Sequence, residues 1–169
     1  MGTADYKGFT LLELMVTVAV ASVTLLIAIP SYQSVVARNA VVAGVNDLVG
    51  DLNYARSEAV DRGQHVYVCP STDQTSCRSK GKNDWADGWI VFAPDPEGSS
   101  VPDDDNILRV HDGIKKGISL DGCTSRVRFN SSGFATGSNC SIEATDDNSA
   151  MTSKVVISNS GRVRIDQGD

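Results

Sequence analysis

A long apolar segment near the amino terminus restricts this chain more than any other feature of its sequence. The 21 residues from Phe9 to Ile29 are apolar or small, apart from a single glutamate at position 13. As an α-helix they would extend about 31 Å at about 1.5 Å per residue, close to the thickness of a bilayer's hydrocarbon core. A secretory signal has a shorter apolar core, about 7–15 residues, followed by a small-residue cleavage site. The segment therefore predicts a membrane-spanning helix rather than a cleaved secretory signal.

Glu13 lies inside this apolar segment and needs a compensating charge. A carboxylate in a membrane span costs about 2.5–3.5 kcal/mol even on the mildest scales, so such residues are usually functional. Cleavage after Gly8 would give Phe9 a free α-amine close to Glu13 in the sequence. That amine is a natural partner for the carboxylate. Beyond the segment, Pro30 has no amide hydrogen and is expected to bend or loosen the helix.

The helical pattern continues beyond Pro30 and becomes amphipathic over residues 31–62. Apolar residues recur at steps of three or four, which places them on one helix face: Val41, Val45, Leu48, Leu52, Ala55 and Ala59. Polar residues fall mostly on the other faces: Asn46, Asp47, Asp51, Arg56, Ser57 and Asp61. Gly63, after Arg62, is expected to end the helix. One helix of roughly 50 residues is predicted, with its apolar stripe packed on a sheet.

The remainder of the chain has the pattern of short strands separated by polar turns. Alternating or continuous apolar runs predict strands at 64–70, 88–94, 106–112, 125–130, 141–145, 154–158 and 162–166. "SNSG" at 158–161 is expected to join the last two as a hairpin, and 94–106 to form a loop. No repeat or second domain boundary is visible. The predicted fold class is α+β, with a long amino-terminal helix packed on an antiparallel β-sheet.

Four cysteines, Cys69, Cys77, Cys123 and Cys140, occur without a CxxC pair. This spacing argues against a zinc site. In an oxidising compartment the four would pair, and three connectivities are possible. Cys69–Cys77 and Cys123–Cys140 are favoured, because each closes a local loop.

Catalytic and metal sites find little support in the sequence. His65 and His111 occur without a nucleophile motif, and no phosphate-binding glycine loop is present. The aspartates at 103–105 could attract calcium, but they lack the alternating spacing of an EF-hand loop and favour a solvated turn. We therefore expect no enzyme activity, no cofactor and no metal.

The acidity of the chain is unevenly distributed. The formal net charge is −6, which argues against a nucleic-acid partner. Residues 30–112 hold 7 Lys or Arg against 13 Asp or Glu, whereas residues 113–169 hold 7 against 6. The last third is thus close to neutral, and it contains clustered arginines.

The amino-terminal residues "KG|FTLLE" resemble the type III signal cut by prepilin peptidase, which is typical of type IV pilins and pseudopilins. The resemblance implies that residues 1–8 are a leader removed between Gly8 and Phe9, and that the Phe9 amine is methylated. It also implies that residues 9–29 first span the bacterial inner membrane and later enter the filament core, where Glu13 meets the amine of a neighbouring subunit. Residues 30–169 would form a periplasmic pilin domain that reaches the cell surface in the pilus.

Three further stretches resemble one group of pilin-like proteins. The stretches are similar to the minor pilins and pseudopilins FimT, FimU and GspH, and most similar to FimT-like minor pilins. They are "LVGDLNYARSEAVDRG", "DWADGWIVF" and "ISNSGRVRI". The resemblance implies a pilin-like fold and three kinds of partner. These are other pilin and minor pilin subunits, the inner-membrane pilus assembly machinery, and prepilin peptidase.

The "GRVRID" stretch is a candidate site for a further partner. In a strand, Arg162 and Arg164 point the same way, about 6.6 Å apart, while Val163 and Ile165 face the core. Two such guanidinium groups can bind successive phosphates of a nucleic acid. The alternative is that alternate arginines simply form the solvated face of a strand. "SRVRFN" repeats the pattern with Arg126 and Arg128, and Lys154 is in the same third of the chain.

A terminal G-R-x-R is a feature of FimT-like minor pilins, some of which bind DNA during uptake for natural transformation. Here the motif matches Gly161, Arg162 and Arg164. The resemblance implies weak, sequence-independent binding of double-stranded DNA, because few phosphate contacts cannot give high affinity. Two alternatives remain open without DNA binding: a purely structural minor pilin that primes pilus assembly, and a GspH-like pseudopilin of a type II secretion system.

Overall fold

The structure is a computed structural model, and it describes residues 8–78, 84–94, 101–103, 105–114, 117–122, 125–146 and 152–167. The chain divides into two compact units, Met1–Val36 and Ala37–Asp169. The second unit is called the head below. One helix, α1 (Leu11–Arg62), contributes to both units and has 52 residues, close to the length that the sequence predicts. It ends before Gly63, as expected.

The first unit contains the apolar half of α1. Its stretch Leu11–Ala28 has the length and composition of a helix that can cross a membrane, and none of it is buried inside the protein. Leucine, valine and methionine side chains along this stretch are more than half exposed. An exposed apolar surface of this length is typical of a site that contacts a membrane or another protein.

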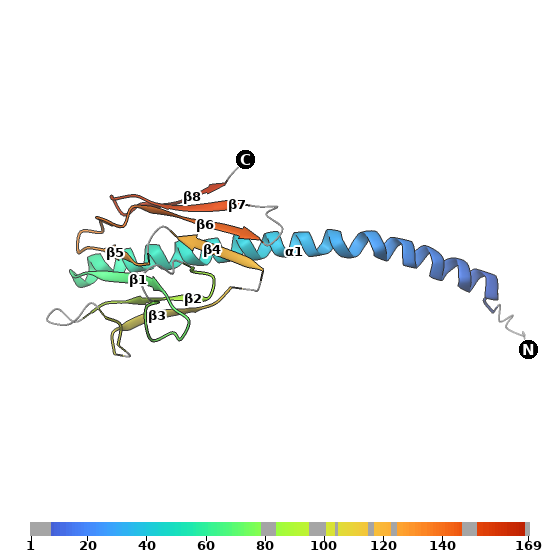
Figure 1. The fold of residues 1–169 in the computed structure, drawn as a ribbon, viewed down its shortest axis with the longest axis horizontal. Coiled ribbons are helices and arrows are strands. Elements are labelled where there is room, and N and C mark those ends of the chain that lie inside the picture. Colours follow the sequence, from blue (N-terminus) through green and yellow to red (C-terminus); the bar gives the residue numbers. More distant parts are fainter. Residues whose placement is uncertain are drawn as a thin grey trace, which may run out of the picture. The chain divides into compact units, whose positions relative to one another are not determined.

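In the described part of the chain, eight strands follow α1 and form two four-stranded antiparallel sheets (Figure 1). The first sheet has the order β3-β2-β1-β5, and the second β4-β6-β7-β8. The strands are β1 (Val66–Pro70), β2 (Gly88–Phe92), β3 (Ile107–Asp112), β4 (Ile118–Gly122), β5 (Val127–Phe129), β6 (Cys140–Asp146), β7 (Thr152–Ile157) and β8 (Val163–Gln167). The α+β class is confirmed, although the head has two sheets where the sequence suggested one.

β4 is the strand that the sequence pattern missed. Its residues "ISLDG" include only two large apolar side chains and end in glycine, a composition that also fits a turn. It becomes a strand because β6 pairs with it over its full length, from Ile118 opposite Asp146 to Gly122 opposite Ile142.

The hydrophobic core of the head forms between α1 and the inner faces of both sheets. All six residues of the predicted apolar stripe are at most 2% exposed. They belong to one cluster with Trp85 and Trp89, with Phe129 of the first sheet, and with Ile142 and Val155 of the second. The helix periodicity and the core role of both tryptophans are therefore confirmed.

Asp51 is an exception to the predicted polar face of the helix, because it is only 4% exposed. Its carboxylate accepts hydrogen bonds from Trp89 Nε1 at 2.8 Å and from Arg109 Nη1 at 2.7 Å. The Arg109 guanidinium also lies 4.0 Å from the centroid of the Tyr54 ring. The hydrogen bond to Asp51 raises the pKa of Arg109 above its ordinary value. This effect is larger than the opposing effect of burial. This polar contact ties α1 to β2 and β3.

A smaller apolar cluster lies apart from the main core and is associated with a disulfide loop. Cys69, Ile90 and Phe92 form its buried part. Cys69 and Cys77 are joined, with their Cα atoms 5.6 Å apart, which is the local pairing that the sequence favours. Cys140 is also disulfide-bonded, and Cys123 lies outside the described residues. Within the loop, hydrogen bonds from the Ser76 hydroxyl and from the Ser76 and Thr75 amides lower the pKa of Asp73 well below its ordinary value.

Candidate functional site

The predicted processing residues and Glu13 lie at the start of α1, and Pro30 lies within it. Gly8 and Phe9 precede the helix, and Phe9 is 83% exposed. The Thr10 hydroxyl accepts a hydrogen bond from the Glu13 amide at 3.2 Å, which is an N-cap, so Glu13 occupies the third helical position. Residues 1–7 lie outside the described chain. The helix continues without interruption through Pro30.

The hydroxyl groups of this apolar helix are satisfied within the helix itself. Thr17 donates to the Leu14 carbonyl, Ser22 to that of Val18, and Thr24 to that of Val20, at 2.7–2.9 Å. These groups can therefore enter a dry environment at little cost. In the described chain, the Glu13 carboxylate has no such bond. Within the described residues of this segment, the carboxylate would thus be left uncompensated if the helix entered a dry environment.

The carboxyl-terminal G-R-x-R lies at the turn between β7 and β8, where the sequence predicted a hairpin. The Gly161 amide donates to the Ser158 carbonyl at 2.9 Å, and the Ser158 amide donates to the Arg162 carbonyl at 3.0 Å. The Ser158 hydroxyl oxygen also accepts from the Arg162 amide at 3.2 Å. The turn is thus closed by backbone and side-chain hydrogen bonds, and it holds the start of the arginine pair in one place.

Gly161 is a structural requirement of this turn. It is buried and has φ +76°, a conformation that residues with a side chain rarely adopt. A Cβ at this position would lie 1.9 Å from the Gly133 carbonyl oxygen. The loop that contains Gly133 is joined to the turn by a second contact, from the Ala135 amide to the Asn159 carbonyl at 3.0 Å. The glycine of the motif therefore permits two loops to meet.

The arginines of the motif differ in their surroundings. Both are exposed, but Arg162 precedes β8 and Arg164 lies within it. Arg164 has a carboxylate oxygen of Asp166 at 3.6 Å, whereas no ion pair is recorded for Arg162 within the described chain. Val163 and Ile165 lie opposite the buried Ile157 and Val155 of β7, so both are on the core face that the sequence predicts. Val163 packs against the core, whereas Ile165 remains 38% exposed on this edge strand. Ile165 therefore lies on the predicted face of β8 but is not buried.

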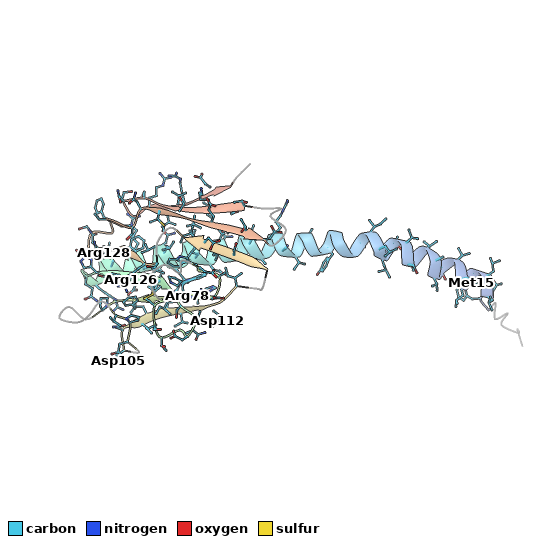
Figure 2. The ribbon with its side chains drawn as sticks, in the orientation of Figure 1. Met15, Arg78, Asp105, Asp112, Arg126 and Arg128 are labelled. Atoms are coloured by element: carbon cyan, nitrogen blue, oxygen red, sulfur yellow. A yellow bond between two sulfur atoms is a disulfide. The ribbon has the colours of Figure 1, made fainter. Side chains whose placement is uncertain are left out.

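The weaker candidates are divided between the two sheets. Lys154 on β7 forms an ion pair with Glu143 of β6 at 2.6 Å, so its charge is already compensated. Arg126 and Arg128 lie beside and on β5 of the other sheet (Figure 2). The Arg126 guanidinium is 5.4 Å from the Tyr67 ring centroid, and Arg128 Nη2 is 3.5 Å from the Thr136 carbonyl oxygen. The structure therefore separates them from Arg162 and Arg164 by strand and sheet.

Arg56 is a basic residue close to the G-R-x-R turn that the sequence did not single out. Its Nε lies 3.2 Å from the positions that a Cβ on Gly133 and a Cβ on Gly161 would occupy. The sequence placed Arg56 on the polar face of the helix, and it is half-buried in the structure. A polar position on an amphipathic helix carries no signal of which distant turn will lie beside it.

Two family models match this chain. The model described as Type II transport protein GspH matches residues 44–161, and the prokaryotic N-terminal methylation motif matches residues 4–29. Two curated fimbrial proteins of Pseudomonas aeruginosa are 42% identical to the chain over 60 residues, which are 36% of this chain and 38% of each relative. The chain thus matches well under two thirds of the length of these relatives.

Solved structures of pilin-like proteins resemble the fold. The type IV minor pilin FimU of Pseudomonas aeruginosa has a TM-score of 0.59 at 20% identity, over 76% of this chain and 90% of its own. The minor pseudopilin EpsH of the Vibrio cholerae type 2 secretion system has a TM-score of 0.53 at 14% identity, over 74% of this chain and 94% of its own. These likenesses show the fold, whereas the GspH model covers most of the head. The chain therefore belongs to the GspH family of type IV minor pilins and pseudopilins, which are structural subunits rather than enzymes.

Proposed function

We propose that this subunit is a minor pilin of a type IV pilus and that its carboxyl-terminal arginines contact double-stranded DNA during uptake for natural transformation. The exposed position of Arg162 is the observation that best supports DNA contact. This residue has an exposed guanidinium without an ion pair in the described chain, on a turn closed by hydrogen bonds and by the contact between Gly161 and Gly133. A guanidinium held in this way can form paired hydrogen bonds to a phosphate.

The charge of the surroundings limits the affinity. Asp166 lies 3.6 Å from Arg164, and the chain as a whole has a net charge of −6. Long-range attraction to DNA is therefore weak, and binding depends on a few direct phosphate contacts. Each such contact releases counterions, so affinity should fall steeply as salt concentration rises and should not depend on base sequence.

Arg162→Ala/Arg164→Ala is expected to lower the affinity for DNA at least tenfold at 50 mM salt, because two phosphate-binding groups are lost. The measurement is fluorescence anisotropy of a labelled 30-base-pair duplex, titrated with the full chain in non-ionic detergent from 50 to 200 mM salt. Arg38→Ala/Arg62→Ala serves as the control, because it also removes two positive charges, but from α1. Equal affinities of wild type and the Arg162/Arg164 variant at every salt concentration would overturn the proposal.

The assembly function rests on the amino-terminal segment. We propose that residues 1–8 are a leader removed by prepilin peptidase, and that Phe9 then carries a methylated amine. Residues 9–29 would hold the subunit in the inner membrane with the following domain, 30–169, in the periplasm. The pilus machinery would then move the helix into the filament. Glu13, whose carboxylate has no partner in the described chain, would pair with the Phe9 amine of another subunit.

Glu13→Ala is expected to leave the subunit in the membrane but to reduce its amount in sheared filaments at least tenfold. The reason is that the unpaired amine of the neighbour would be buried without a compensating charge. Immunoblots of membrane and filament fractions measure both quantities. Thr17→Ala is the control, since the Thr17 hydroxyl bonds only to its own helix. Normal incorporation of the Glu13 variant would contradict the pairing.

A second candidate function is a pseudopilin of a type II secretion system, favoured by the description of the matching family model and by the fold of EpsH. A deletion strain separates the two. Loss of pili with normal protein secretion supports the pilus function, whereas retained pili with blocked secretion supports the secretion function. Loss of pili together with absent DNA binding at low salt would leave a purely structural minor pilin.

A further inference from the structure

Arg56 of α1 lies beside the turn that carries Arg162. Its Nε is 3.2 Å from the Cβ position of Gly133 and equally close to that of Gly161. Both glycines have φ +76°, and neither has a side chain to displace the guanidinium. The stem of Arg56 also passes Gly133, where Cγ lies 3.6 Å from the Cβ position. The helix and two loops therefore bring Arg56 to the residue that precedes Arg162 in the chain.

Arg56 has no ion pair with a carboxylate within the described chain, unlike four other arginines of the head. Four others are paired with carboxylates: Arg62 with Glu58, Arg78 with Asp84 and Asp87, Arg109 with Asp51, and Arg164 with Asp166. Within the described chain, neither an ion pair nor a side-chain hydrogen bond is recorded for Arg56, although it is half-buried. A guanidinium has five N–H donors in a planar arrangement that matches a phosphate. Partial burial keeps this charge less screened than that of a fully exposed side chain.

Val60 lies near this cation, and Phe134 is exposed on the loop that contains Gly133. Val60, which is 50% exposed, has its Cγ2 3.2 Å from the Cβ position of Gly133. Phe134 follows Gly133 in the chain and is 48% exposed. Exposed apolar side chains beside an arginine can contact the sugars of a DNA backbone, a surface that a small inorganic anion does not offer.

We propose that Arg56 and Arg162 together form one phosphodiester-binding site for double-stranded DNA, with Gly133 and Gly161 as the close-packed backbone between them. This inference rests on the proposed function, and it assigns to α1 a part of the DNA contact that the G-R-x-R motif does not contain. Arg164 has a lesser part, because Asp166 already shares its charge. The site thus spans the helix and the β7–β8 turn.

Arg56→Gln is expected to lower the affinity for the 30-base-pair duplex about three- to tenfold and to reduce the slope of log affinity against log salt by about 0.9, as for one lost phosphate contact. The protein is the full chain in non-ionic detergent. Arg62→Gln is the matched control on the same helix, because it removes one charge that Glu58 already pairs at 2.6 Å. It should leave the slope unchanged. Equal slopes for wild type and Arg56→Gln would overturn the assignment of Arg56.

A measurement on the wild-type chain makes the test independent of any loss of folding in Arg56→Gln. The Nε–Hε signal of Arg56, identified by its absence in Arg56→Lys, should shift in the NMR spectrum when the duplex is added. A duplex that binds without moving this signal excludes Arg56 from the site. If Arg162→Ala/Arg164→Ala abolishes binding while Arg56→Gln does not alter the slope, only the Arg56 assignment fails. If the wild-type chain does not bind DNA at any salt concentration, the proposed function fails with it.

Discussion

Replacing Asp51 with alanine is expected to lower the free energy of unfolding of the head by about 2–3 kcal/mol. Asp51 is 4% exposed and accepts hydrogen bonds from Trp89 Nε1 and Arg109 Nη1. Without the carboxylate, the indole N–H loses its acceptor in the core, where water cannot replace it. Arg109 loses less, because 47% of its side chain is exposed and can be hydrated.

Asp51 contacts residues of more than one strand, so its loss weakens several contacts of the helix with the first sheet. Trp89 lies on β2 and stacks on His111 of β3, with ring centroids 4.0 Å apart, and Arg109 of β3 lies over Tyr54 of the helix. The carboxylate therefore joins the helix to two strands at once. β3 is an edge strand, so its other edge contributes no ladder hydrogen bonds to offset the loss.

Urea unfolding of the full chain in detergent, followed by tryptophan fluorescence, measures the effect, since both tryptophans are buried in the head. Asp47→Ala is the control on the same helix. Asp47 has 55% of its side chain exposed and lies 3.5 Å from His111 Nε2, so its loss should cost less than about 1 kcal/mol. Asp51→Asn, which keeps an acceptor, should fall between the two. A loss for Asp51→Ala no larger than that of the control would show that the buried pair contributes little net stability.

Gly161→Ala is expected to destabilise the head by about 3 kcal/mol, since two costs are added. The first is the left-handed backbone conformation, φ +76°, which costs a residue with a Cβ about 1–2 kcal/mol. The second is overlap of the new methyl group with the Gly133 carbonyl oxygen, 1.9 Å from the Cβ position. That oxygen belongs to the backbone, so the two loops must separate to relieve the overlap.

Gly137→Ala is a closely matched control for this prediction. Gly137 has the same φ of +76°, but nothing lies within 4 Å of its Cβ position. It should therefore show only the backbone cost, about 1–2 kcal/mol. The difference between the two variants in urea unfolding isolates the overlap with Gly133. Equal losses would mean that the loops relax freely, and that the contact between Gly133 and Gly161 does not hold the turn.

The sequence predicted much of the fold because helix and strand periodicities are local properties. The stripe of Val41, Val45, Leu48 and Leu52 is buried as predicted, and seven of the eight strands lie where alternation or apolar runs indicated them. The β7–β8 hairpin and the Cys69–Cys77 pair were also predicted correctly, since each joins residues that are close in the chain.

The errors concern residues whose surroundings come from distant parts of the chain. The sequence pattern predicts Asp51 to be a polar surface residue, because its partners Trp89 and Arg109 lie 38 and 58 residues further along the chain. Ile165 lies on the core side of β8, as its alternation predicts, but it is 38% exposed because β8 is an edge strand. Arg126 and Arg128 have the same alternating pattern as Arg162 and Arg164, but the structure places the two pairs in different sheets with different surroundings.

The sequence by itself determined the membrane-length helix with its single carboxylate, the α+β class, and the positions of most strands. These depend on backbone hydrogen bonds and side-chain periodicity over a few neighbouring residues. Only the tertiary structure decided that Asp51 is buried, that Arg164 forms an ion pair with Asp166, and that Arg56 lies beside Gly161. Contacts between the helix and a turn near the end of the chain arise when both pack on the same core, and nothing in the local pattern of either segment specifies them.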